Sequence, residues 1–140
     1  MTEKPSKSVT ATALAQKKRL REAELLLDIS RKMSAIDSLD TVLNVLVEMT
    51  SEELGAERGT LFLNDAETGE LYSRVAMGSF QREIRILNNS GVAGHVFSTG
   101  EGVLIQDAYA DNRFNRSIDE QTGFVTRNIL CVPIKTAKGE

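Results

Sequence analysis

The sequence predicts an α+β domain in which an antiparallel sheet carries helices on one face. Residues 10–36 contain neither proline nor glycine and are rich in Ala, Leu, Lys, Arg and Glu, a composition that favours helix. From Gly59 onward, apolar and polar residues alternate over short stretches, as they do in half-buried strands. Turn-forming runs such as DAETGE separate these stretches, so that consecutive strands can pair antiparallel.

The N-terminal third should hold a disordered end followed by a long helix. Residues 1–10 are polar and contain Pro5, so we expect them to be disordered. Residues 11–36 should form an amphipathic signalling or dimerisation helix. Upstream of Leu20 its apolar stripe becomes weaker, so this part of the helix should project from the domain. Its apolar stripe consists of Leu26, Ile29, Met33 and Ile36. Two arrangements are open, a parallel homodimer through this helix and a helix folded back on its own domain.

A second helix and a series of strands should follow. Asp37 or Ser38 can cap the second helix, and Gly55 ends it. Its expected buried face is formed by Leu39, Leu43, Leu46 and either Met49 or Thr50. The expected strands are residues 59–65, 70–77, 82–88, 102–108 and 127–136. A short helix should span residues 90–100, and residues 109–124 should be irregular with one helical turn.

Composition argues against several classes of function. The net charge of −3 and the pI of about 5.3 disfavour a nucleic-acid binder, and the basic run QKKRLR is better explained as a solvated helix face. No secretory signal and no membrane-length apolar run is present, and a single cysteine suits the cytoplasm. With only His95 and Cys131, no four-ligand zinc site can be built, and no phosphate-binding loop occurs. We therefore expect no catalytic or metal site in this chain.

Polar side chains gather in the irregular segment before the last strand. Asn115 offers an amide, Asp119 a carboxylate, and Thr122 and Thr126 offer hydroxyls. With the sheet as a floor and the short helix as part of a lid, these groups could enclose a small polar ligand, and the helix start at Gly91 could receive its anionic group. Ordinary loop solvation is the alternative explanation.

Three stretches, GTLFLND, GVAGHVFSTGEGVLIQDAYADNRFN and DEQTGFVTRNILCVPIK, together resemble a GAF domain. The resemblance covers roughly residues 39–140 and is closest to the GAF domains of cyclic-nucleotide phosphodiesterases and bacterial adenylyl/guanylyl cyclases. It implies an antiparallel sheet with helices on the back face and a ligand lid on the front. Residues 37–140 would then be a GAF domain whose C-terminal part is truncated, lacking the last strand and helix. It also implies a cytoplasmic sensory module, usually dimeric, that regulates an output domain in the same chain.

The same resemblance implies which residues bind the ligand and which ligand they bind. By position, the ligand-binding residues would be Thr60, Met77, Ala93, Asn115, Asp119, Thr122 and Thr126. Ala93 would face a cyclic phosphate, whereas Asn115 and Met77 replace an aromatic and a base-reading acid that some cyclic-nucleotide binders have. The implied ligand is cAMP or cGMP, and the implied output is an adenylyl/guanylyl cyclase. The alternative is a ligand-free dimerisation or relay module of a phosphodiesterase or histidine kinase.

Overall fold

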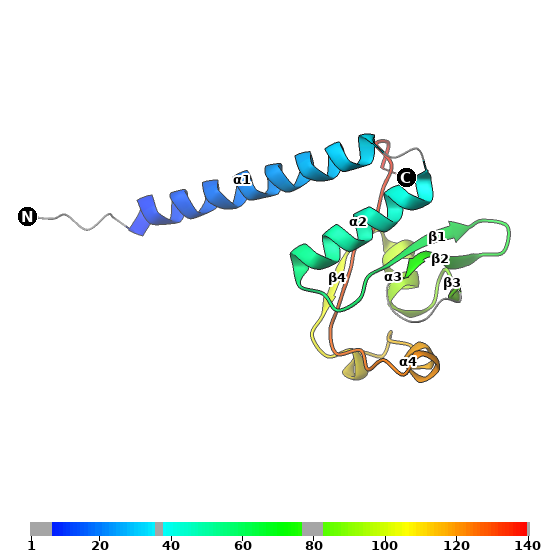
Figure 1. Cartoon of the computed structure of the whole chain (residues 1–140). Coiled ribbons are helices and arrows are strands. Elements are labelled where there is room, and N and C mark those ends of the chain that lie inside the picture. Colours follow the sequence, from blue (N-terminus) through cyan, green and yellow to red (C-terminus); the bar gives the residue numbers. More distant parts are fainter. Residues whose placement is uncertain (1–6, 36–37, 77–82, 140) are drawn as a thin grey trace, which may run out of the picture.

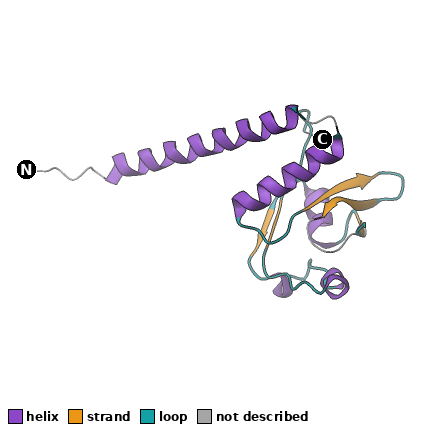
Figure 2. Cartoon of the chain, viewed as in Figure 1, coloured by secondary structure: helices purple, strands orange, loops and turns teal. Residues whose placement is uncertain are grey.

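The computed structural model describes residues 7–35, 38–76 and 83–139, and it shows a long helix followed by an α+β domain (Figure 1). The elements are α1 (Lys7–Ser34), α2 (Leu39–Leu54), β1 (Thr60–Asp65), β2 (Glu70–Ala76), β3 (Arg85–Leu87), α3 (Gly91–Thr99), β4 (Val103–Ile105), the 3-10 helix η1 (Ala108–Ala110), α4 (Ser117–Thr122) and β5 (Ile129–Cys131). Figure 2 shows how helices and strands share the domain. The predicted α+β class is confirmed.

Helix α1 projects from the domain over its N-terminal half and lies beside α2 over its C-terminal half (Figure 1). It begins at Lys7, so residues 7–10 are helical and not disordered as predicted, whereas residues 1–6 lie outside the described part. The half-buried side chains are Leu25, Ile29 and Met33, spaced four residues apart. Of the predicted stripe, Ile29 and Met33 belong to this row, Leu26 is 67% exposed in the single chain, and Ile36 lies outside the described residues.

Helix α2 supplies one side of the small hydrophobic core. Val47 packs with Leu61 of β1 and Val75 of β2, and Leu43 adjoins them. Leu39 is 66% exposed, which corrects its predicted place on the buried face. Positions four residues apart lie on one side of a helix, so the packed face follows residues 43, 47 and 51. Gly55 ends the helix with φ of 63°, as the sequence predicts.

The strands form two antiparallel ladders, with the order β1-β2-β3 in one and β4-β5 in the other. The register pairs Thr60 with Ala76 and shifts between Leu61 and Phe62, while Leu104 faces Leu130 in the second ladder. β3, β4 and β5 are each three residues long, shorter than predicted. Helix α2 packs on β1 and β2, whereas α3 contacts β3 and β5 and so bridges the ladders.

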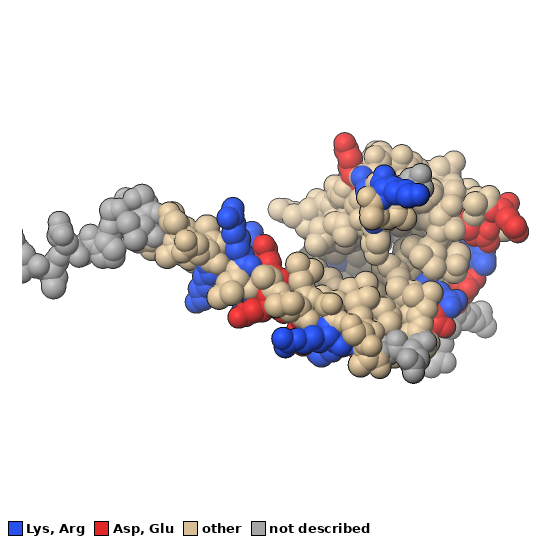
Figure 3. Space-filling model, turned by 90° about the horizontal axis from the view of Figure 1, so that it is seen from above, with Lys and Arg blue, Asp and Glu red and all other residues tan. Residues whose placement is uncertain are grey.

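The surface mixes both signs of charge along α1 and over the domain, and it is hollowed at the centre of the domain in the view from above (Figure 3). Several large apolar side chains of the second ladder and its continuation are more than half exposed, namely Leu104, Leu130, Val132 and Ile134. The described residues therefore enclose a core near α2 and leave the face of β4 and β5 open.

Candidate functional site

The carboxylate of Asp119 on α4 fastens the segment between β4 and β5, residues 107–126, which we call the lid segment. Asp119 is only 7% exposed. The Tyr109 hydroxyl donates to its Oδ2 at 2.8 Å, the Thr126 backbone N–H donates to Oδ2 at 2.7 Å, and the Thr126 hydroxyl donates to Oδ1 at 2.6 Å. One carboxylate thus joins η1, α4 and the approach to β5.

These contacts determine the charge of the group. Burial alone raises the pKa of Asp119, but the hydrogen bonds from Thr126 and Tyr109 and the nearby charge of Arg58 outweigh it, so the pKa lies below its ordinary value. The hydrogen bond to this carboxylate, with help from burial, raises the pKa of Tyr109. At neutral pH the pair is therefore a carboxylate accepting from a neutral phenol.

Aromatic and cationic side chains support the lid segment. The rings of Tyr109 and Phe114 lie 5.3 Å apart between centroids, and the Arg116 guanidinium lies 4.8 Å from the Tyr109 ring. Arg116 also donates from Nη2 to the Tyr109 carbonyl at 3.0 Å. At the end of α4, the Thr122 hydroxyl accepts from the Phe124 backbone N–H at 3.3 Å. The polar groups of this segment therefore hold its own conformation.

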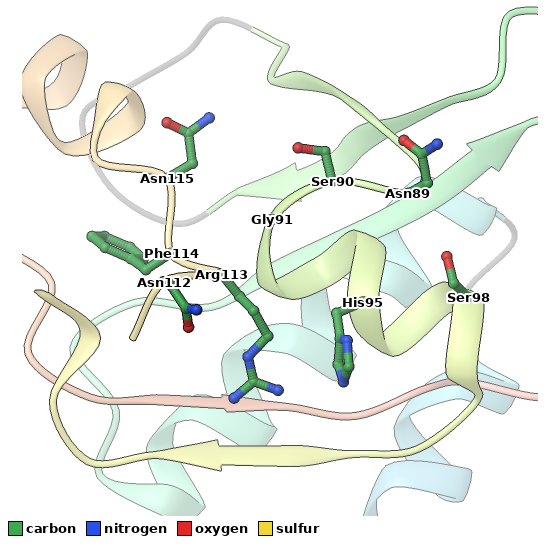
Figure 4. Close-up of a pocket in the computed structure, with 9 residues that line it drawn as sticks. All are labelled: Asn89, Ser90, Gly91, His95, Ser98, Asn112, Arg113, Phe114 and Asn115. Atoms are coloured by element: carbon green, nitrogen blue, oxygen red, sulfur yellow. The ribbon is translucent and has the colours of Figure 1, made fainter. Parts of the chain in front are cut away.

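An open pocket of about 510 Å³ lies between α3 and the first part of the lid segment (Figure 4). Its walls are Asn89, Ser90 and Gly91 at the entry to α3, His95 and Ser98 along that helix, and residues 112–115. His95 and Arg113 point to one side of the first turn of α3, and Ser90 and Asn115 to the other (Figure 4). Gly91 has φ of 72°, a conformation that favours glycine, where it approaches the Arg113 carbonyl.

The charge of Arg113 is already matched within the pocket wall. Its Nε and Nη2 donate to the two oxygens of Asp111 at 2.9 and 2.7 Å. This fork of hydrogen bonds lowers the pKa of Asp111 to about 2. The first-turn N–H groups of α3 have no acceptor within the helix, so they can meet a ligand here. Polar side chains of the pocket wall can do so too, namely those of Asn89, Ser90, His95, Ser98, Asn112 and Asn115.

The structure separates the predicted ligand-binding residues into different places. Of that set, Asn115 lines the pocket, and its Oδ1 accepts from the Ser117 N–H at 2.9 Å. Ala93 lies half-buried on α3, and Thr60 opens β1 with an exposed side chain. Asp119, Thr122 and Thr126 gather in the lid segment, and Met77 lies outside the described residues.

Two residues that the sequence did not single out belong to this region. Tyr109 holds Asp119, and its position in a polar loop next to a strand was the only signal that could have marked it. Arg58 places its guanidinium 4.1 Å from the centroid of the Phe124 ring. No periodicity or motif connects these two positions, because they meet only through the tertiary fold.

Two further properties concern the described residues as a whole. None of their helices combines the length and the apolar character that a bilayer span requires. Within residues 7–35, 38–76 and 83–139, no cluster of three or more His, Cys, Asp or Glu side chains is placed to hold a metal ion. Cys131 in β5 is half-buried, and burial raises the pKa of its thiol.

Comparison with known proteins identifies relatives along most of the chain. It is 35% identical over 130 residues to the probable 3',5'-cyclic phosphodiesterase pde-5 of Caenorhabditis elegans, covering 84% of this chain and 18% of that protein. It is 34% identical over 139 residues to the dual 3',5'-cyclic-AMP and -GMP phosphodiesterase 11 of Drosophila melanogaster, covering 88% and 10%. The chain therefore spans less than a fifth of the length of either relative.

A solved structure and a family model agree on the fold. The GAF domain from a phosphoenolpyruvate-protein phosphotransferase of Coxiella burnetii superimposes with a TM-score of 0.75 at 21% identity, covering 84% of this chain and 71% of that one. The family model of the GAF domain matches residues 38–140. The resemblance read from the sequence is confirmed, and the chain belongs to the GAF-domain family.

Proposed function

We propose that this chain is a regulatory part of a cyclic-nucleotide phosphodiesterase and that its GAF domain binds cAMP or cGMP. The observation that carries this proposal is the identity of about a third with two phosphodiesterases, one of which acts on both nucleotides by its name. These relatives favour a phosphodiesterase output over the adenylyl/guanylyl cyclase that the sequence suggested. The output domain and a cytoplasmic location remain predictions.

The pocket at α3 supports a cyclic nucleotide as the ligand. Its volume of about 510 Å³ falls within the range of small-molecule sites. In the proposed complex, the first-turn N–H groups of α3 near Ala93 receive the cyclic phosphate, because a helix N-terminus favours an anion. Asn115 on the opposite wall offers its amide nitrogen as a donor for the base or ribose, while its Oδ1 already accepts from the Ser117 N–H.

The lid segment has a different part in this proposal from the one that the resemblance implies. Asp119 and Thr126 direct their polar groups at each other, and Asp119 receives a third hydrogen bond from Tyr109. An ionised carboxylate has about four acceptor sites, three of which these donors already use, and Asp119 is only 7% exposed, so little of it is left to contact a ligand. We therefore assign Asp119 and Thr126 to closing the lid segment, and Asn115 and the α3 entry to contacting the ligand.

Isothermal titration calorimetry with cAMP and cGMP tests the binding proposal, with 5'-AMP and 5'-GMP as controls that share the bases. We expect saturable binding of at least one cyclic nucleotide, weakened about fivefold to tenfold by Asn115→Ala, since one hydrogen bond is lost. Asn44→Ala on the exposed face of α2 is the matched control and should bind normally. Absence of heat with both cyclic nucleotides up to about 1 mM would overturn the binding proposal.

A ligand-free dimerisation module is the second candidate, and exposed leucines on α1 favour it. The side chains of Leu14, Leu20, Leu26 and Leu27 are 58 to 71% exposed on a helix that projects from the domain. Leu20 and Leu27 are seven residues apart and so lie on one stripe, which a second copy could cover as a parallel helical pair. Sedimentation analysis of Leu20→Asp/Leu27→Asp should then show monomer where the original chain shows dimer. Met33 is already half-buried within the single chain, so its substitution would test packing in the monomer as well as dimerisation.

A further inference from the structure

The loop after α2 contacts the lid segment through one side chain. Arg58 lies three residues after Gly55, the residue that ends α2. Its guanidinium carbon is 4.1 Å from the centroid of the Phe124 ring, within the range of a cation–π contact. Its charge also helps to lower the pKa of Asp119. Arg58 is half-buried, so water screens these contacts less than it would at the surface.

The last turn of α2 contacts α1 on its other side. The Arg21 Nε donates to Glu53 Oε1 at 2.9 Å, and this hydrogen bond lowers the pKa of Glu53. The contact links residues 32 positions apart and lies near the half-buried row of Leu25, Ile29 and Met33. The Arg21 side chain is 74% exposed, so this pair marks where the last turn of α2 meets α1 and contributes little stability by itself.

The two contacts are joined by a short and well-bonded stretch of backbone. The Gly55 N–H donates to the Glu52 carbonyl at 3.1 Å, and the Ala56 N–H donates to the Ser51 carbonyl at 2.8 Å. Ser51 itself is buried, at 6% exposure. These bonds fix the end of α2 as far as Ala56, so only two residues of backbone separate this bonded turn, which contains Glu53, from Arg58.

We propose that Arg58 couples the lid segment to helix α1. When the hydrogen bonds around Asp119 form, Phe124 is held under Arg58, and the last turn of α2 keeps Glu53 in contact with Arg21. When the lid segment opens, Arg58 loses the Phe124 ring and the Asp119 charge, and the α1 contact weakens. This coupling rests on the proposed function, because it gives the route by which an occupied pocket would act on the flanking helix.

Hydrogen exchange measured by mass spectrometry on the whole chain, without nucleotide, tests the coupling. Asp119→Asn replaces an acceptor with an amide and should open the lid segment. We expect faster exchange in residues 107–126 and also, by at least about twofold, in residues 20–33 of α1, a change in the range of couplings through packed contacts. In the Arg58→Gln background, Asp119→Asn should still speed exchange in the lid segment but should no longer affect α1.

A matched control and the reciprocal experiment make the outcome decisive. Arg74→Gln removes an arginine that pairs with Asp40 at the opposite end of α2, and it should leave the response of α1 to Asp119→Asn intact. Because coupling is reciprocal, Arg21→Gln should speed exchange in the lid segment. If Asp119→Asn unfolds the chain, Tyr109→Phe removes a single donor and serves in its place.

Two results would overturn the coupling. One is an open lid segment with unchanged exchange in residues 20–33, and the other is an α1 response that persists in the Arg58→Gln background. Neither result would bear on whether the pocket binds a cyclic nucleotide, since no ligand is present in the exchange experiment. Conversely, a negative calorimetric titration would leave the contact route from Phe124 through Arg58 and Glu53 to Arg21 open to this test.

Discussion

Two charged side chains, Asp119 in the lid segment and Arg85 in β3, each make three polar contacts but differ in burial. Asp119 is 7% exposed and accepts from neutral donors. The side chain of Arg85 is 41% exposed and pairs with Glu83 at 2.6 Å, Glu70 at 3.1 Å and Asp65 at 3.5 Å.

This difference in burial indicates that the number of polar contacts alone does not determine how much a charged side chain contributes to the free energy of unfolding. Water and salt screen the Arg85 pairs, and exposed ion pairs contribute little to stability. The donors around Asp119 would be left without partners if the carboxylate were removed, and an unsatisfied buried group is costly. We therefore expect the lid segment to depend on Asp119 far more than the β2–β3 ladder depends on Arg85.

Removal of the buried carboxylate should give the largest effect. Asp119→Ala should lower the free energy of unfolding by about 2–4 kcal/mol, since it breaks three hydrogen bonds and strands their donors. Urea denaturation followed by circular dichroism measures this change. Glu120→Ala, at the adjacent exposed position, should stay within about 0.5 kcal/mol of the original chain. Equal losses in the two variants would contradict the assigned role of Asp119.

Acidification should remove the contribution that Asp119 makes to the free energy of unfolding. Its pKa is lower in the folded chain, so its stabilisation is complete above the ordinary carboxyl value near 3.9 and is lost as the pH falls through the folded-state pKa. The difference in unfolding free energy between the original chain and Asp119→Asn should therefore be constant above about pH 5 and shrink as the pH falls below about 3.9. If this difference in unfolding free energy grew on acidification, it would contradict a lowered pKa of Asp119 in the folded chain.

Removal of one donor should have a smaller effect than removal of the acceptor. Tyr109→Phe deletes the hydroxyl that donates to Asp119 Oδ2 and leaves both Thr126 bonds in place. The pKa of Tyr109 is raised, so the contribution of this bond is complete below the ordinary value near 10 and is lost as the pH rises through the folded-state pKa. Ultraviolet titration at alkaline pH should show a component above that value which disappears in Tyr109→Phe.

The exposed arginine should give the smallest effect. Arg85→Gln removes pairs with three acids, yet water already screens these pairs. We expect a slight decrease in the denaturation midpoint at low salt and no measurable decrease near 1 M NaCl, where the screening length is only about 3 Å. A large loss that is independent of salt would abolish the contrast with Asp119.

Much of the secondary structure was predictable from local patterns. The spacing of glycines and polar caps located both ends of α2 and α3, since backbone conformation at a helix end depends on the residues there. The irregular segment, expected to hold one helical turn, contains two helical elements, η1 and α4. Predicted strands were too long because alternation of polar and apolar residues continues beyond the last ladder hydrogen bond, as at Val132 and Ile134 after β5.

The candidate site was predictable only in part. The sequence marked Asn115, Asp119, Thr122 and Thr126 as a polar group next to a strand, and all of them lie around the lid segment. It could not show that Asp119 and Thr126 bond to each other while Asn115 faces the pocket. Side chains a few residues apart in an irregular loop have no fixed relative orientation, unlike those on a helix or strand.

By itself, the sequence determined the α+β class, the GAF resemblance and the positions of the main helices, because composition, periodicity and end residues act over a few neighbouring positions. Only the tertiary structure decided that Arg58 meets Phe124, that Arg21 meets Glu53 and that Tyr109 completes the hydrogen bonding of Asp119. The first two contacts join residues 66 and 32 positions apart, and no local propensity encodes them. Burial of Val47, Leu61 and Val75 packs α2 against β1 and β2, and this core lies on either side of the segment that carries Glu53 and Arg58.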